Sequence, residues 1–225
     1  CRFGGDPAAL DRDPPRWAVP LTDLRIGQAA TTRDRLGFRI TDMVTFTQEQ
    51  PQDADAIEQL LDRVFGATRC QKTSYRFRDR VAPVGPLCYV AKDGDKVIGT
   101  LRYWPVEIGP NGTPALLLGP LAVDETYRGL GLGADLMDVT LAACAAHGHQ
   151  IIVLVSDLAE FYGKFNFIPA APTGITMPGE KTERLYVRGL MPQALVGVEG
   201  PVRPFGASSL KARSVKNRSA KRKAA

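Results

Sequence analysis

The feature that most restricts the fold of this chain is a glycine-rich stretch between a predicted strand and a predicted helix. The stretch reads Tyr127-Arg128-Gly129-Leu130-Gly131-Leu132-Gly133-Ala134. A turn of this kind exposes unpaired backbone N–H groups at the positive end of a helix dipole, and its glycines let a phosphate approach the chain closely. With the Arg128 guanidinium at its rim, the stretch predicts an anion-binding turn. A plain glycine-rich connection is the alternative interpretation.

The segments around this turn indicate a domain that mixes helices and strands. Asp93-Gly94 and Asn111-Gly112 separate three strand-like segments and favour hairpin turns, so they predict a three-stranded antiparallel meander. The continuous apolar run Ile151 to Val155 is typical of a buried parallel strand. Strands are predicted at 43–47, 87–91, 96–108, 115–123, 151–155, 167–170 and 185–188, and helices at 53–65, 129–147 and 158–165.

Two other phosphate-binding turns can be compared with the glycine-rich stretch. A P-loop ends in Gly-Lys-Ser/Thr, whereas this turn continues as Gly133-Ala134-Asp135, so a P-loop is excluded. Gly129, Gly131 and Ala134 match the dinucleotide-binding fingerprint, but its glycines follow the strand almost at once, and here residues 124–128 intervene. Asp157 also lies farther along the chain than the acidic residue of that fold. An antiparallel meander is foreign to a doubly wound sheet, so a dinucleotide-binding protein is the weaker alternative.

Three segments resemble the GNAT superfamily of acyl-CoA N-acyltransferases, and within it the YhbS-like branch. Arg128, Gly131 and Gly133 match the Q/R-x-x-G-x-G/A turn that binds the pyrophosphate of CoA in that family. Residues 118–123 resemble the strand whose backbone receives the pantetheine arm, and residues 161–167 resemble the F-Y-x-x-x-G-F segment. Asn166 replaces the glycine of this last pattern, and Asn is the residue that best tolerates the left-handed conformation expected there.

The resemblance implies a fold, a co-substrate and a set of binding residues. The implied fold is α+β, with a central mixed, mostly antiparallel sheet of about six to seven strands flanked by helices and one parallel pair splayed at the acyl-CoA site. The implied co-substrate is acetyl-CoA or another acyl-CoA, and no metal is expected. The predicted cofactor-binding residues are Leu121, Ala122, Val123, Arg128, Gly129, Gly131, Gly133 and Ala134.

Pro120 gives a physical reason to expect a gap beside the strand at 115–123. Proline has no N–H to donate to a ladder, so it belongs at an edge, at a bulge or where two strands part. If the strands at 115–123 and 151–157 separate beyond Pro120, backbone groups of Leu121 and Val123 can pair with the two amides of pantetheine. A proline tolerated on an edge strand is the alternative.

The implied activity is an acyl-CoA-dependent N-acetyltransferase, which moves an acetyl or other acyl group to a primary amine by direct attack in a ternary complex. Such a reaction needs a neutral amine, a site for the oxyanion and a proton for the leaving thiolate. The resemblance places the Tyr162 hydroxyl near the sulfur, so Tyr162 is the predicted catalytic acid; a packed aromatic is the alternative. The base is not identified, and Glu107, Glu125, Asp157 and a chain of waters all stay open.

The acceptor pocket is predicted to form from residues 66–86, including Tyr75 and Phe77, and from residues 171–183. Neither segment has a motif that names an amine, so a small molecule, an amino acid and a peptide N-terminus all stay open, as does a homodimer. A catalytically silent acyl-CoA sensor would keep the same glycine-rich turn, and the sequence alone does not separate a sensor from an enzyme.

The net charge of +5 reflects one end of the chain. Residues 207–225 contain seven of the 29 Lys and Arg residues and no acidic residue. The rest of the chain therefore has 22 basic and 24 acidic side chains. We therefore predict an irregular leader over 1–40, an acyltransferase domain over 41–200 and a basic, disordered tail over 201–225. Without interleaved aromatics, this tail predicts only weak nucleic-acid contacts. Four widely spaced cysteines and no apolar span predict reduced thiols, a cytoplasmic location and no membrane segment.

Overall fold

The computed structural model describes residues 44–79 and 81–206. The predicted leader and residues 207–225 of the predicted tail lie outside this range. In the described part of the chain, no helix is both long enough and apolar enough to span a bilayer.

The central element is a mixed sheet with the strand order β1-β2-β3-β4-β5-β8-β6. Neighbouring strands along this path are antiparallel except for β4 and β5, which are parallel. This arrangement confirms the predicted fold class. The strands are β1 Val44–Gln48, β2 Tyr89–Asp93, β3 Lys96–Ile108, β4 Thr113–Val123, β5 Ile151–Val155, β6 Ile168–Pro169 and β8 Leu185–Gly189.

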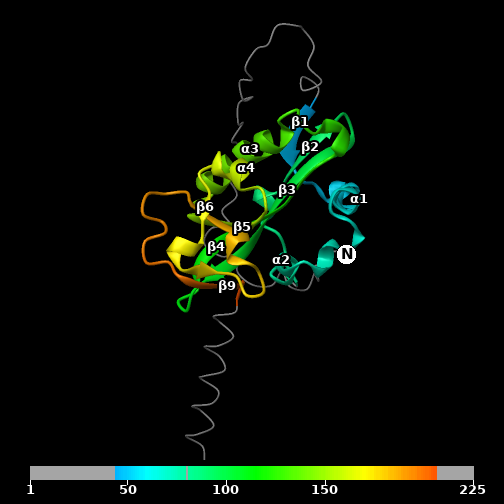
Figure 1. The fold of residues 1–225 in the computed structure, drawn as a ribbon. Helices are drawn as coiled ribbons and strands as arrows, with labels where there is room; N and C mark the ends of the chain where they lie inside the picture. The colour runs from blue at the N-terminus through cyan, green and yellow to red at the C-terminus, as the bar shows by residue number, and fades with distance from the viewer. Residues whose placement is uncertain (1–43, 80, 207–225) are drawn as a thin grey trace, which may run out of the picture.

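Helices cover both faces of the sheet, as Figure 1 shows, with α1 and α2 on one side and α3 and α4 on the other. The buried side chains of helix α1, Ile57, Leu60 and Leu61, pack against Val90, Val97 and Ala122 of the sheet. Gly66, with φ 81°, directly follows the last residue of this helix. The α-helices of the described residues are α1 Ala54–Phe65, α2 Thr73–Arg76, α3 Leu132–Ala146 and α4 Ala159–Gly163.

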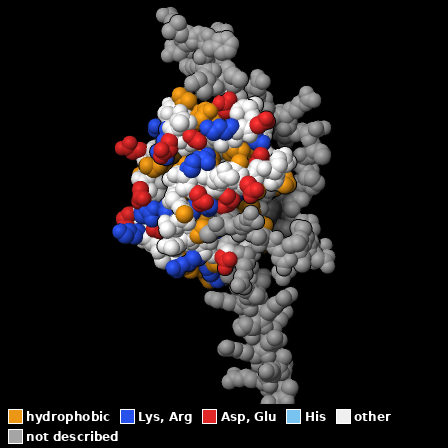
Figure 2. Space-filling view, turned by 90° about the vertical axis from the view of Figure 1, so that its right-hand side faces the viewer, with side chains coloured by type: hydrophobic (Ala, Val, Ile, Leu, Met, Phe, Trp, Pro, Cys, Tyr) orange, Lys and Arg blue, Asp and Glu red, His pale blue; other side chains and the backbone are white. Residues whose placement is uncertain are grey.

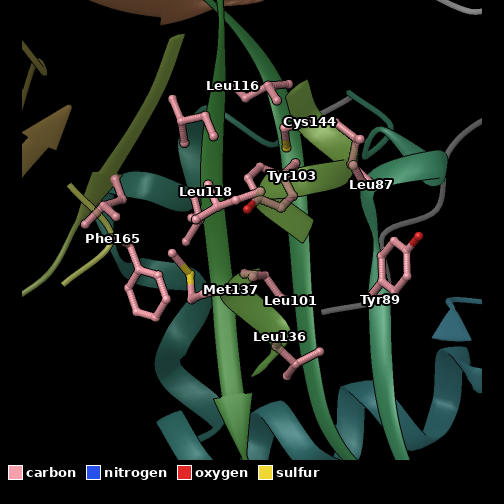
Figure 3. Packing of buried hydrophobic residues seen from close by; sticks show 14 of the residues in the cluster. Leu87, Tyr89, Leu101, Tyr103, Leu116, Leu118, Leu136, Met137, Cys144 and Phe165 are labelled. Carbon is pink, nitrogen blue, oxygen red and sulfur yellow. The ribbon is translucent and has the colours of Figure 1, made fainter. Parts of the chain in front are cut away.

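The largest hydrophobic cluster lies between the sheet and α3. Figure 3 shows Leu101, Tyr103, Leu116 and Leu118 of the two long strands next to Leu136, Met137 and Cys144 of the helix. The hydroxyl groups of Tyr103 and Thr140 are 3.0 Å apart, so these two buried polar groups are hydrogen-bonded to each other. This packing fixes the start of α3 beside the end of β4, where the predicted site lies.

Two short strands were not predicted, β7 Ile175–Thr176 and β9 Gly200–Pro204. They pair with each other, and β9 also pairs antiparallel with β3, opposite Val106 to Ile108. Two-residue strands and a Gly/Pro-rich strand have no alternation that a period-two search can detect. The predicted domain boundary at residue 200 therefore falls at the start of a paired strand, and Val202 is fully buried.

The cysteines differ from the expectation of four reduced thiols. Cys88 and Cys144 are free and buried, and burial raises the pKa of each thiol to about 12. Cys70 is disulfide-bonded, which a count of widely spaced cysteines could not indicate.

Candidate active site

The two parallel strands separate where the sequence analysis expected them to part. Pairing between β4 and β5 is limited to Leu116 with Ile152 and Leu117 with Val153, although β4 continues to Val123. Within the described residues, no strand pairs with this side of β4 beyond Leu117. The opening begins just before Gly119 and Pro120, which are joined by a cis peptide bond.

The hydrogen-bond alternation of β3 and β4 decides which backbone groups face this opening. The Asp124 N–H donates to the Ile98 carbonyl at 2.8 Å, so this pair is hydrogen-bonded. In an antiparallel ladder hydrogen-bonded and non-hydrogen-bonded pairs alternate. Ala122, opposite Thr100, therefore directs its N–H and C=O toward β3, whereas Leu121 and Val123 direct theirs toward the opening.

The glycine-rich turn lies at the end of β4 and begins α3. Gly129 and Gly131 have φ values of 81° and 88°, and a Cβ at either position would have no neighbour within 4 Å. Both glycines are thus in the left-handed region and border open space, as a turn that receives a ligand requires. A Cβ at Gly133 would lie 3.7 Å from Phe161 and 3.8 Å from Val123. The turn, α4 and the end of β4 therefore meet at one place.

The donors of this turn are not equivalent. The N–H of Ala134 already donates to the Gly131 carbonyl at 2.8 Å, and that of Asp135 to the same carbonyl at 3.1 Å. The N–H groups of Leu132 and Gly133, in the first turn of the helix, have no intrahelical acceptor. Arg128 pairs with Glu125 at 3.2 Å, but both side chains are mostly exposed, so this ion pair is weak and readily exchanged for an anion.

Tyr162 lies on α4, next to the Ser156 side chain, which directly follows β5. Its ring packs edge-on against Phe161 and Phe167, with centroids 5.0 and 5.9 Å away. Burial raises the pKa of Tyr162 to about 12, and the adjacent Ser156 hydroxyl acts in the opposite direction. The phenol therefore stays protonated at neutral pH and can donate a proton. Asn166 adopts φ 57°, the left-handed conformation expected from its place in the pattern.

The three carboxylates considered as bases are occupied or remote. Glu107 lies at the opposite end of β3 from the opening and accepts from the Gly206 N–H at 3.0 Å. Asp157 accepts two hydrogen bonds from Arg184, at 2.7 and 3.1 Å. Glu125 is the partner of Arg128. No one of the three is a free carboxylate facing the opening.

A buried charge cluster next to the opening was missed by the sequence analysis. Arg102, at the irregularity where β3 passes Gly119 and Pro120, donates twice to Glu49 at 2.7 Å and once to Glu58 at 3.2 Å. Glu58 also accepts from Arg69 at 2.5 Å, and Arg69 donates to Asp62 and to the Tyr75 hydroxyl. These residues are far apart in sequence, so the only signal available was an arginine at an inward-facing strand position.

Tyr75 and Phe77, two residues predicted to line the acceptor pocket, are both buried in the α2 segment. Phe77 packs with Trp104 and with Met177 from the second predicted pocket segment. The Thr73 hydroxyl donates to the Gly179 carbonyl at 2.9 Å. The two segments are thus neighbours on the face of the sheet opposite α3.

Together, a parallel strand pair that opens, a glycine-rich turn at a helix start and a buried phenol define an acyl-CoA-binding acyltransferase of the predicted kind. A family model for the acetyltransferase (GNAT) domain matches residues 46–170. The chain belongs to the GNAT acetyltransferase family, which confirms the resemblance seen in the sequence.

Individual relatives agree with this assignment. The chain is 34% identical over 157 residues to the uncharacterized N-acetyltransferase YhbS of Escherichia coli K12, which covers 68% of this chain and 92% of that protein. The crystal structure of E. coli YhbS in complex with CoA matches with a TM-score of 0.64 and 30% identity, over 79% of this chain and 94% of that one. A GNAT acetyltransferase from Brucella melitensis in complex with acetyl-CoA shares the fold, with a TM-score of 0.54 at 23% identity over 73% of this chain and 97% of that one.

Proposed function

We propose that this protein transfers an acetyl group from acetyl-CoA to a primary amine by direct attack in a ternary complex. The observation that carries the proposal is the opening between β4 and β5 directly beside the α3 turn. The family membership of the chain and the CoA complex of its relative YhbS support the same co-substrate.

In this proposal the pyrophosphate of CoA binds at the turn from Arg128 to Gly133. The N–H groups of Leu132 and Gly133 and the positive end of the α3 dipole supply donors, and the Arg128 guanidinium adds charge. The pantetheine amides pair with Leu121 and Val123, as an added strand would. Ala122 and Ala134, predicted from the sequence as binding residues, would contribute through shape, because the Ala122 peptide groups face β3 and the Ala134 N–H already has an acceptor.

The chemical step joins the amine nitrogen to the thioester carbonyl carbon and breaks the C–S bond. Backbone N–H groups at the β4 opening stabilise the oxyanion, and the Tyr162 hydroxyl donates its proton to the leaving thiolate. The proton released from the amine passes to water, since Glu107, Glu125 and Asp157 are engaged elsewhere. Tyr162 regains its proton from solvent after CoA leaves.

Calorimetry with CoA, acetyl-CoA and NADH tests the proposal. We expect acetyl-CoA to bind with a micromolar or lower Kd and NADH not to bind. Thiol release from acetyl-CoA in the presence of amines then distinguishes an enzyme from a catalytically silent acyl-CoA sensor. Binding of NADH but not of CoA would overturn the proposal in favour of a dinucleotide-binding protein. A cytoplasmic location and a homodimer stay predictions.

A further inference from the structure

Arg78 is a buried cation that lies beside the β4 opening, and within residues 44–79 and 81–206 it forms no ion pair with an acidic side chain. Its side chain follows α2, and only 4% of the residue is exposed. The Nε and Nη1 atoms are buried without a hydrogen-bond partner among the described residues. The Nη2 atom lies 3.4 Å from the point that a Cβ at Gly119 would occupy, so the guanidinium rests against the backbone where β4 leaves β5.

The surroundings of Arg78 are aromatic and positively charged. Its guanidinium carbon is 4.6 Å from the Tyr75 ring centroid and 5.8 Å from that of Trp104. Burial lowers the pKa of Arg78 to about 10. Tyr75 raises this pKa, and the nearby charges of Arg102 and Arg69 lower it further. The group is still a cation at neutral pH.

The neighbouring arginines are different, because each has its own carboxylates. Arg102 is held by Glu49 and Glu58, and Arg69 by Glu58 and Asp62. Burial lowers the pKa of Arg102, but the hydrogen bond and charge of Glu49, together with the charge of Glu58, contribute to a net rise above its usual value. A buried guanidinium without an anion is costly, and proteins rarely keep one unless something else supplies the charge.

We propose that Arg78 binds a carboxylate of the acceptor, so that the amines acetylated by this protein are amino acids or closely related amino carboxylates. The inference rests on the proposed function, which places the thioester at the β4 opening. Arg78 lies on the face of the sheet that carries α1 and α2, opposite α3 and its pyrophosphate turn. An acceptor that enters from this face meets Arg78 next to Gly119, with its amine directed to the thioester and its carboxylate to the guanidinium.

Charge favours this class over other amines. A polyamine or a lysine side chain would bring a second cation next to Arg78, and like charges at close range repel. A carboxylate instead gives the guanidinium a charge-assisted partner in a site that excludes water, where such a bond is strong. On binding, Arg78 exchanges part of its contact with the two rings for the carboxylate.

The test compares amino acids with their primary carboxamides, using glycine, leucine and phenylalanine as acceptors. Thiol release from acetyl-CoA gives kcat/KM for each acid and amide. The carboxamide amines are less basic, and more of each is neutral at a given pH, so a preference for the acid cannot come from the amine. We expect the wild type to prefer the acid at least about tenfold, and Arg78→Met to lower kcat/KM for the acid by about tenfold to a hundredfold while changing that of the amide little.

Arg76→Met is the matched control, because it removes an exposed arginine from α2, two residues before Arg78. It should keep the preference for acids, and Arg78→Lys should keep part of it. Binding of N-acetylglycine and N-acetylglycinamide, measured by calorimetry with and without CoA, provides a readout that does not need turnover. We expect only the acid to bind, and Arg78→Met to abolish this difference.

The proposal is overturned if acids and carboxamides bind and react alike, or if Arg78→Met keeps the preference. It is also overturned if amides are the better acceptors. Acetyl-CoA calorimetry on the same proteins distinguishes failure of the proposed function from failure of the Arg78 assignment. If the wild type does not bind acetyl-CoA, the proposed function is contradicted. If it acetylates amines without selecting for a carboxylate, only the assignment of Arg78 is contradicted.

Discussion

At the residue scale, Tyr162 is the group whose chemistry can be isolated best. Replacing it with Phe removes one hydroxyl and keeps the ring that packs between Phe161 and Phe167. A positioned general acid typically contributes roughly 100- to 10,000-fold, but a CoA thiolate is a fairly good leaving group, so we expect kcat to fall by about tenfold to a hundredfold. The Kd for acetyl-CoA should change little. Steady-state kinetics and calorimetry on the same variant check both statements.

Two further measurements identify the proton donor. The loss in Tyr162→Phe should shrink with acyl donors whose thiol is more acidic, because their thiolates need the proton less. Since the pKa of Tyr162 is raised to about 12, ionisation of this phenol should not reduce kcat below about pH 11. Wild-type rates from Tyr162→Phe with every donor would show that Tyr162 only packs.

Gly131 tests the turn on the other side of the opening. Its φ of 88° is strained for any other residue, but a Cβ there would meet nothing within 4 Å. Gly131→Val should weaken CoA binding strongly, because the branched side chain occupies the space that a phosphate would enter, while the protein stays folded.

The matched control for this variant is Gly148→Val at the far end of α3. Gly148 has φ 75° and equally open surroundings, so valine there carries a similar backbone strain without touching the site. Calorimetry should give the wild-type Kd for CoA with Gly148→Val. An equal loss of affinity in the two variants would mean that helix strain, and not the phosphate site, is responsible.

At the scale of elements, β9 is the strand whose contribution is easiest to remove. Val202 is fully buried and lies opposite Ile108 on β3. Ending the chain at residue 199 exposes this contact and removes the partner of β7, which should cost about 2 kcal/mol or more. For a chain of this size that corresponds to a fall in Tm of roughly 4–8 °C. Thermal unfolding of the shortened chain measures it, with the chain ending at residue 206 as its control.

At the scale of the whole molecule, the positive net charge comes from residues 207–225, whereas the rest of the chain is close to neutral. Figure 2 shows one face of the described body, on which acidic and basic side chains are interspersed without a field of one sign. Deleting residues 207–225 removes seven basic side chains. We expect Tm and CoA affinity to stay within error, because a segment rich in Lys, Arg and Ser offers little apolar area to bury.

Only salt-sensitive binding to polyanions should weaken in this deletion, which retention on a heparin column at increasing salt can measure. A fall in Tm of many degrees would instead show that these residues stabilise the body, and would move the domain boundary toward the end of the chain.

The sequence by itself determined the parts of this protein that depend on local signals. Hairpin dipeptides, an apolar run and a glycine-rich turn defined the meander, β5 and the start of α3, because each is encoded within a few neighbouring residues. Pro120 marked the place where β4 parts from β5, and Asn166 marked a left-handed turn. The same signals carried the resemblance to the family and the predicted roles of Tyr162 and Arg128.

Only the tertiary structure decided the features that join distant segments. The pairing of β9 with β3 brings together residues about a hundred positions apart, and no local pattern specifies such a contact. The same holds for the carboxylates that hold Arg102 and Arg69. Whether a buried arginine has an anion beside it depends on which segments fold over it, so only the structure distinguished Arg78 from its neighbours.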